Sequence, residues 1–262
     1  MLLVKDILNH IKQDYTLPEG SVDELLYGDL SHNVTGIAVM FMPTIRALQE
    51  ATQLNCNLIL THEGLFFHHW KTPHVKGKVY QEKEAYIKEQ GMNIFRFHDL
   101  IHMYNPDKIT AALTDTLFPN VVSKQIFPTY TVIELKNAQS LFSLRTQIKA
   151  TLQLPTYRYV GEDLHHIKRI GLFVGYRGNG EHVIPTFEDD QVDLVIYGEG
   201  FEWETPEYVR DSLETSSPKS LIILGHYASE APGMALFAEE LAQSFPDVPV
   251  HYIDSGSPFS YG

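Results

Sequence analysis

Short apolar runs alternate with helix-compatible segments along most of the chain, and this alternation constrains the fold more than any other feature of the sequence. Residues 36–42 are a near-continuous apolar run, which predicts a buried strand. Residues 43–54 fit a helix with Pro43 in its first turn, and residues 57–60 fit a second buried strand. Strands that are apolar on both faces are typical of parallel sheets covered by helices. The opening therefore predicts a strand–helix–strand unit and an α/β layered fold.

The same alternation continues to residue 253, and Phe127-Pro128 marks the break at which we expect one domain to end. We predict two α/β domains, residues 1–127 and residues 128–262. Further helices are expected over 4–13, 79–90, 107–117, 140–152, 207–214 and 234–244. Further strands are expected over 93–97, 130–135, 167–174, 192–197, 221–224 and 249–253.

Three segments that contain histidine each follow a predicted strand: residues 61–69, 97–102 and 225–230. Ligand sites in open α/β sheets form at the carboxyl ends of the strands. His98 and His102 are four residues apart, as are His226 and Glu230, so each pair would lie on one face of a helical turn.

These segments offer four imidazoles and two carboxylates, which are ligand types of transition-metal sites. A single tetrahedral zinc ion needs fewer ligands, so the set suits two ions that share a bridging ligand. One such pair alone is common on a protein surface, but three pairs after three strands favour a metal centre. The candidate metal ligands are His62, Glu63, His98, His102, His226 and Glu230.

The same motifs resemble those of the NIF-three-like family, whose members are often described as GTP cyclohydrolase type-two homologs. The resemblance covers most of the chain, and its most specific motif is Gly225-His226-Tyr227-Ala228-Ser229-Glu230. It also includes Leu60-Thr61-His62, His98 and the turn Tyr197-Gly198-Glu199. The resemblance implies two related α/β domains, with mixed sheets flanked by helices and a dinuclear metal cleft between them. It also implies a homo-oligomer, with a hexamer expected.

Two candidate ligands depart from the family pattern. The family reads Thr-His-His-Pro where this chain has Glu63 and Gly64 at the last two positions, and it has Asp at the position of His102. One imidazole has become a carboxylate and one carboxylate an imidazole, so the formal charge of the site is retained. We interpret this as a rearranged dinuclear site, and the alternative is a site that has lost one metal. Mixed imidazole and carboxylate ligands suit Zn, Fe, Mn, Ni or Co.

Several neighbouring residues are weaker candidates. Glu199 ends a predicted strand, and the resemblance implies a place near the metals, where it could orient a ligand or contact substrate. His68, His69 and His74 fit a solvated or lid-like loop, and the alternative is contact with substrate or with the metal ligands. Residues 175–180 are rich in glycine and fit a plain loop, and the alternative is anion binding through Arg177.

Two functions are compatible with this site. The first is metal-dependent hydrolysis of a small phosphorylated or nucleotide-like substrate, with Glu63 or Glu230 as the candidate general base. The cyclohydrolase description enters by resemblance only, because one fold and one metal site can support many reactions. The second is a non-catalytic metal-binding protein that delivers or inserts metal, or acts as a regulatory partner.

The charge balance restricts the partners. There are 20 Lys and Arg against 33 Asp and Glu, so the formal net charge is −13. Binding to nucleic acid or to an anionic membrane depends on a basic surface, so neither partner is expected. The first residues do not read as a signal peptide, and no apolar run approaches the length of a membrane helix. We therefore expect a cytoplasmic protein that acts on a small molecule.

Overall fold

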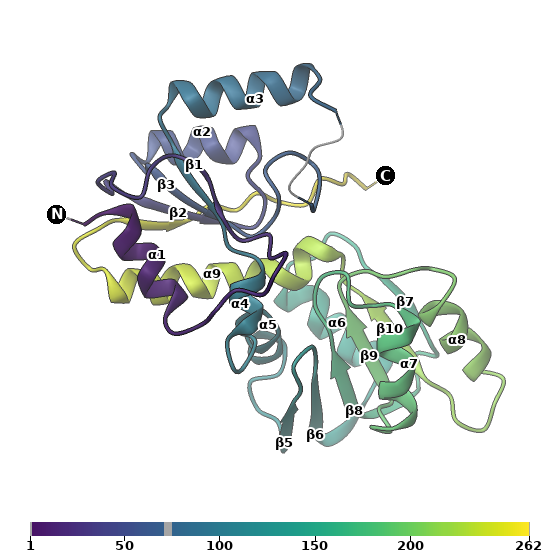
Figure 1. Cartoon of the computed structure of the whole chain (residues 1–262). Helices are drawn as coiled ribbons and strands as arrows, with labels where there is room; N and C mark the ends of the chain where they lie inside the picture. The colour runs from purple at the N-terminus through teal and green to yellow at the C-terminus, as the bar shows by residue number, and fades with distance from the viewer. Residues whose placement is uncertain (1, 71–74, 262) are drawn as a thin grey trace. The chain divides into compact units, whose positions relative to one another are not determined.

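The computed structural model describes residues 2–70 and 75–261, and the chain divides into two compact units (Figure 1). Unit 1 comprises Met1–Tyr104 and Met234–Gly256, and unit 2 comprises Asn105–Gly233 and Ser257–Gly262. This division differs from the boundary that we expected after residue 127. The chain leaves unit 1 after Tyr104, earlier than we expected. It returns to unit 1 at Met234, so Met234–Gly256 also belong to that unit.

Unit 1 is built on a five-stranded sheet in the order β1-β4-β3-β2-β11. Strands β2, β3, β4 and β11 are parallel, and β1 is antiparallel to β4. The strands are β1 (Leu25–Tyr27), β2 (Ile37–Met40), β3 (Leu58–Thr61), β4 (Asn93–Arg96) and β11 (Val250–Tyr252). The helices are α1 (Val4–Lys12), α2 (Ile45–Gln53), α3 (Lys78–Glu89), α4 (Asp99–Met103) and the later part of α9 (His226–Ser244).

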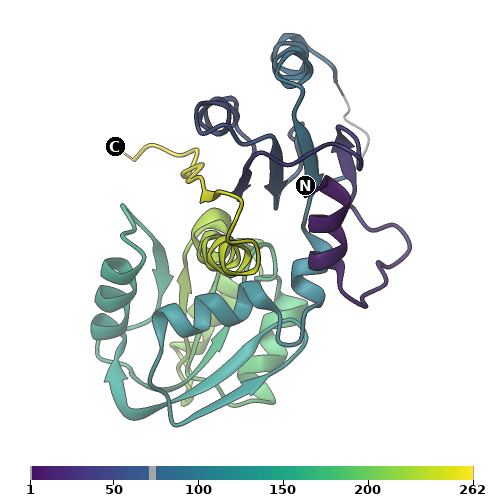
Figure 2. The same cartoon turned by 90° about the vertical axis from the view of Figure 1, so that its left-hand side faces the viewer.

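Helices cover both faces of this sheet, which is why every residue of β2, β3 and β4 is buried. Figures 1 and 2 show α2 and α3 on one face, and α1 with the later part of α9 on the other. Thr44 caps the start of α2, because its hydroxyl accepts a hydrogen bond from the backbone N–H of Ala47 at 3.1 Å. Its buried residues Ala47 and Leu48 belong to the same apolar cluster as Met40 and Ile59 of the sheet.

Strand β11 explains why the C-terminal region belongs to unit 1. It pairs in parallel with β2, with Val250 opposite Ile37 and Tyr252 opposite Val39. The strand was predicted, at residues 249–253, but its sheet was not. Hydrophobic pattern alone predicts that a strand is buried, and it does not say which neighbour it joins.

Unit 2 is built on a six-stranded sheet in the order β5-β6-β8-β9-β10-β7. The central strands β8, β9 and β10 are parallel, and the outer pairings are antiparallel. The strands are β5 (Ser123–Ile126), β6 (Thr131–Ser140), β7 (Arg158–Val160), β8 (His166–Leu172), β9 (Leu194–Tyr197) and β10 (Ser220–Ile223). The helices are α5 (Lys108–Leu117), α6 (Leu141–Thr151), α7 (Gly180–Glu188), α8 (Thr205–Ser212) and the first part of α9.

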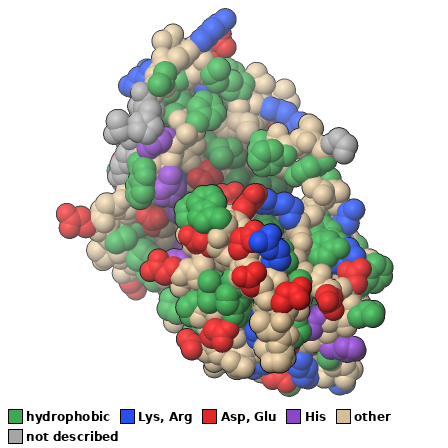
Figure 3. Space-filling view, turned by 90° about the vertical axis from the view of Figure 1, so that its right-hand side faces the viewer, with side chains coloured by type: hydrophobic (Ala, Val, Ile, Leu, Met, Phe, Trp, Pro, Cys, Tyr) green, Lys and Arg blue, Asp and Glu red, His purple; other side chains and the backbone are tan. Residues whose placement is uncertain are grey.

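The predicted fold class is confirmed, because both units are α/β and each mixed sheet is flanked by helices. Among the described residues, no helix has the length and apolar character needed to cross a membrane. On the face shown in Figure 3, acidic side chains are spread over the surface with basic ones among them, in keeping with the net charge of −13.

Candidate metal centre

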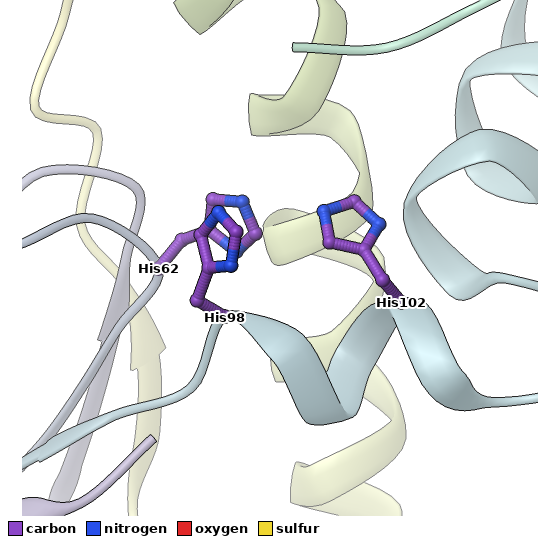
Figure 4. A group of neighbouring side chains, drawn as sticks. All are labelled: His62, His98 and His102. Atoms are coloured by element: carbon purple, nitrogen blue, oxygen red, sulfur yellow. The ribbon is translucent and has the colours of Figure 1, made fainter. Parts of the chain in front are cut away.

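Three histidines of unit 1 come together where two parallel strands end. His62 directly follows β3, His98 follows β4 and Phe97, and His102 is one turn further along α4. One ring nitrogen of each lies within 4.8 Å of one ring nitrogen of each of the others. The rings of His62 and His98 stack with centroids 4.5 Å apart, and the His102 ring turns toward both, at 5.3 and 5.5 Å (Figure 4). His98 and His102, which are four residues apart, therefore present their rings on the same side of one helical turn.

Hydrogen bonds fix which ring nitrogen of two of these residues could bind a metal. His98 Nδ1 lies 2.9 Å from the Asp99 carboxylate, and His62 Nδ1 lies 3.3 Å from the backbone carbonyl oxygen of Phe97. Both partners are acceptors, so the proton of each neutral ring is on Nδ1 and the lone pair is on Nε2. This is the arrangement that metal-binding histidines commonly have.

The charge states of His98 and Asp99 also suit metal binding. Burial lowers the pKa of His98 to about 4, because the charged ring loses water on entering the site, and the nearby His62 and His102 add to this effect. The hydrogen bond to His98 holds the pKa of the Asp99 carboxyl well below its usual value. At neutral pH the ring is therefore neutral and its neighbouring carboxylate is charged.

The turn that carries His98 is anchored by a carboxylate from another part of unit 1. Asp23 accepts hydrogen bonds from three successive backbone N–H groups, those of His98, Asp99 and Leu100, each at 2.8 Å. In return, Asp99 accepts a hydrogen bond from the backbone N–H of Val22 at 3.0 Å. These bonds satisfy donors at the start of α4 that have no partner within the helix. They fix the position from which His98 and His102 project.

Glu63 lies beside the three histidines and forms an ion pair with Arg96, with Glu63 Oε2 and Arg96 Nη2 3.4 Å apart. The Arg96 side chain is only 3% exposed. Glu63 also belongs to a second group of potential ligands, with His69 and His98, whose ligand atoms lie within 4.8 Å of one another. His69 was predicted to be part of a solvated or lid-like loop, with contact to substrate or to the metal ligands as the alternative, and no periodic spacing links it to Glu63 or His98.

Unit 2 carries its own cluster of imidazole and carboxylate groups. His226 and Glu230 are one turn apart at the start of α9, with His226 Nε2 and Glu230 Oε2 3.1 Å apart. His226 Nδ1 lies 3.0 Å from the carboxylate of Glu199, which follows β9. Glu199 thus contacts a candidate ligand that is 27 residues away in sequence, and its role near a metal stays a prediction.

Glycines leave room for this second cluster. A Cβ atom at Gly175, whose φ is +56°, would approach Glu230 and come within 3.2 Å of His226 Nε2. The hydroxyl of Ser229 accepts a hydrogen bond from the Gly175 backbone N–H at 2.9 Å, so this loop lies directly against α9. The glycine-rich segment 175–180 therefore serves close packing.

The alternative of anion binding at segment 175–180 finds no support in the contacts. Arg177 Nη1 is 2.9 Å from the Asp107 carboxylate, which already neutralises it. Glu204 accepts a hydrogen bond from the backbone N–H of Gly180 at 2.7 Å, so a carboxylate already occupies the start of α7. The loop carries out the structural role that we favoured.

The remaining candidate is His68, whose Nδ1 lies 3.1 Å from the backbone carbonyl oxygen of Trp70. Within the described residues, His68 belongs to no group of potential metal ligands. It lines a shallow cavity of about 40 Å³ with Arg96, Glu24 and Trp70. His74 lies outside the described residues.

The residues present fit a divalent transition metal ion. Three imidazoles converge in unit 1. In His62 and His98, Nδ1 donates a hydrogen bond to an oxygen while Nε2 keeps its lone pair. Nitrogen-rich sets of this kind suit Zn, Ni, Co or Fe better than Mg or Ca. The two α/β units, with these clusters at the ends of their parallel strands, define an α/β protein with candidate metal-binding sites.

Comparison with known proteins assigns this protein to a family. The sequence profile of the Duf34/NIF3 (NGG1p interacting factor 3) family matches residues 4–258, so the chain belongs to that family. A protein of Clostridium perfringens described as "GTP cyclohydrolase 1 type 2 homolog" is 25% identical, over 98% of this chain and 99% of its own. A protein of the same description from Clostridium acetobutylicum is 24% identical, over 92% of this chain and 90% of its own.

The fold also matches solved structures. The crystal structure of Staphylococcus aureus protein SA1388 superposes with a TM-score of 0.78, at 17% identity and over 99% of both chains. This likeness concerns the fold alone. The predicted family is thus confirmed from the profile, and the predicted fold class from the structure and its neighbours.

Proposed function

We propose that this protein binds a divalent transition metal ion through His62, His98 and His102. The observation that carries the proposal is the convergence of three ring nitrogens within 4.8 Å of one another. His98 is neutral at physiological pH, so it does not have to lose a proton before it binds a metal.

A metal-binding experiment tests the proposal directly. The untagged chain, stripped with a chelator and dialysed, should take up Zn²⁺ or Co²⁺ in calorimetry and in metal analysis. His102→Ala should weaken uptake strongly, whereas His10→Ala, on the exposed face of α1, should not. Equal uptake by the wild type and by His102→Ala would reject the site.

The predicted dinuclear centre of six ligands stays a prediction. One support is the family membership. The other is the second cluster of His226, Glu230 and Glu199, in which the Glu199 carboxylate contacts Nδ1 of His226. Two ions per chain, with one or both lost in His226→Ala, are the expected result. One ion per chain in the wild type would favour the alternative of a site that has lost a metal.

For the reaction, we propose hydrolysis of a small phosphorylated or nucleotide-like substrate. A divalent ion held by the histidines would supply Lewis-acid chemistry toward a phosphoryl or carbonyl oxygen. Glu63 is our general-base candidate in unit 1, because its carboxylate lies beside histidines that would hold the ion, a position that suits proton transfer. Glu230, next to His226, is the corresponding candidate in unit 2.

The non-catalytic alternative, metal delivery or a regulatory partnership, makes a different prediction. Hydrolysis requires turnover of phosphate esters, nucleotides or cyclic amides, and Glu63→Gln or Glu230→Gln should abolish this turnover even when the variant is saturated with metal to offset its weaker ligand. Delivery requires rapid transfer of the metal to an acceptor chelator without turnover. A homohexamer is expected for either function, and sedimentation of a 29.9 kDa species at micromolar concentration would contradict it.

A further inference from the structure

The loop between Gly64 and Trp70 folds back toward the strand ends from which it starts. A Cβ atom at Gly64 would lie 2.5 Å from the carbonyl oxygen of His68, a distance that no side chain tolerates. Phe67, near the tip of the loop, has a φ of +59°, which reverses the chain direction. Glycine at position 64 therefore permits a return that brings residues 68–70 back beside Glu63.

Two buried cations hold the returned loop in place. The Arg96 guanidinium donates to the carbonyl oxygens of His62 and His69, so it links both ends of the loop. Lys83 donates to the carbonyl oxygen of Leu65 at 2.6 Å, and its ammonium group lies 5.2 Å from the centroid of the Phe67 ring. The loop is thus fixed by its backbone, and the His69 side chain is positioned with it.

This fixed loop places His69 against the metal-binding residues of the strand ends. The ring of His69 meets that of His98 edge to face, with centroids 4.9 Å apart. Its ligand atom lies within 4.8 Å of those of Glu63 and His98. His69 is itself exposed, so an ion could reach it from solvent.

The surrounding charges favour a cation at this position. Arg96 is the buried cation next to Glu63, and four carboxylates act on it: Glu63, Asp23, Asp99 and Glu24. These carboxylates also favour a divalent ion beside Glu63, because opposite charges at short distance attract each other.

We propose that His69 is a metal ligand, and that an ion bound to His98 is also held by Glu63 and His69. The inference rests on the proposed metal binding and extends it to a residue of the loop. His98 has one nitrogen to offer, since its Nδ1 donates to Asp99, so it serves a single ion. His69 therefore adds an imidazole ligand that the six-residue set does not contain.

The proton on His69 must change position when the ion binds. Arg96 Nη2 donates to His69 Nδ1 at 3.2 Å, so the neutral ring carries its proton on Nε2. An ion bound at Nε2 would require the ring proton to be on Nδ1, and the hydrogen bond from Arg96 to this nitrogen would then be lost. Arg96 keeps its bonds to the two backbone carbonyls.

Titration of the untagged, metal-free full chain with Co²⁺ tests the inference, because affinity and the visible spectrum of Co²⁺ both report its ligands. His69→Ala should lower Co²⁺ affinity by more than about 10-fold, since even residues that only orient a ligand are worth about 10–100-fold. It should also change the Co²⁺ spectrum. His68→Ala is the matched control in the same loop, and it should change neither.

A second variant addresses the loop without removing any ligand. Gly64→Ala should weaken Co²⁺ binding as His69→Ala does, because its Cβ atom displaces the backbone at His68. Wild-type affinity and spectrum in His69→Ala would overturn the inference, and so would an equal loss in His68→Ala. If the wild type itself bound no Co²⁺, the proposed function would fail, and that result is distinct from either of these.

Discussion

Asp99 and His98 are adjacent in the chain, and their side chains bond to each other, with Oδ1 of Asp99 2.9 Å from Nδ1 of His98. In unit 2, Glu199 and His226 make the equivalent contact at 3.0 Å. A carboxylate that accepts a hydrogen bond from Nδ1 of a histidine fixes the tautomer and makes Nε2 a stronger metal ligand. Both units therefore contain the same pairing, built in one case from neighbours and in the other from two separate strand ends.

Asp99→Asn should weaken metal binding by about 10–100-fold, the usual effect of removing a partner of this kind. The Asn amide has the same shape as the Asp99 carboxylate but no negative charge, so Nε2 of His98 becomes a weaker ligand. Competition with a chelator measures the affinity, and ¹⁵N NMR of the imidazole reports the tautomer. Asp29→Asn, at an exposed turn, is the control. An unchanged affinity and an unchanged tautomer would show that Asp99 does not orient His98.

Asp23→Ala should lower the free energy of unfolding by about 1–3 kcal/mol, because it removes the acceptor of three backbone N–H groups at the start of α4. Urea denaturation of the metal-free chain gives the value, with Glu19→Ala at an exposed position for comparison. The metal affinity should fall as well, since the turn that carries His98 and His102 loses its anchor. Equal stability of the two variants would contradict this role.

The exchange at Glu63 and His102 should behave as a compensated pair. Both residues belong to ligand groups that contain His98. Glu63→His with His102→Asp restores the family arrangement and keeps the formal charge, so the double variant should retain its metals. Each single change alters the charge by one unit and should bind metal more weakly than the double variant. Full metal content and wild-type affinity in both single variants would mean that the two positions do not compensate each other.

Lys83 should make stability depend on pH in the alkaline range. Burial lowers its pKa from 10.5 to about 8, because the ammonium group loses water. Between these pH values the unfolded chain binds more protons than the folded chain, so the free energy of unfolding rises with pH. The stability that Lys83 contributes is therefore complete above pH 10.5 and is lost as the pH falls through 8. Relative to Lys83→Met, the wild type should therefore gain on the order of 3 kcal/mol between pH 8 and 10.5.

Urea denaturation of both proteins at several pH values measures the difference, and other titrating groups cancel. Lys78→Met replaces an exposed lysine of the same helix and should show no such dependence. A difference between the wild type and Lys83→Met that stays constant across this range would disprove the effect.

The strands that position the candidate ligands could be predicted because they are short, apolar and buried on both faces. The predicted strand at 57–60 corresponds to β3, and that at 93–97 corresponds to β4. The expectation that His62, His98 and His226 each come shortly after a strand is confirmed on the same grounds. Helix α7 was not predicted, because its residues 180–188 include Pro185 and follow a glycine-rich loop.

The parts of the site that escaped prediction depend on contacts between distant residues. His69 is brought to His98 by a loop whose course is fixed by Gly64, Arg96 and Lys83, and no periodicity encodes such a return. Asp23 is 75 residues from His98, the first residue whose N–H it binds. Helix α9 begins at His226, earlier than the predicted 234, and it passes through Pro232 and Gly233.

The pairing of β11 with β2 has a consequence for synthesis on the ribosome. All of residues 105–233 lie between the two parts of unit 1, and at roughly 5–20 residues per second their translation takes on the order of ten seconds. Throughout that time β2 is an open edge, with the hydrogen-bonding groups of an apolar strand unpaired. Nascent chains should therefore be most prone to aggregation, and most dependent on chaperones, while unit 2 is being made.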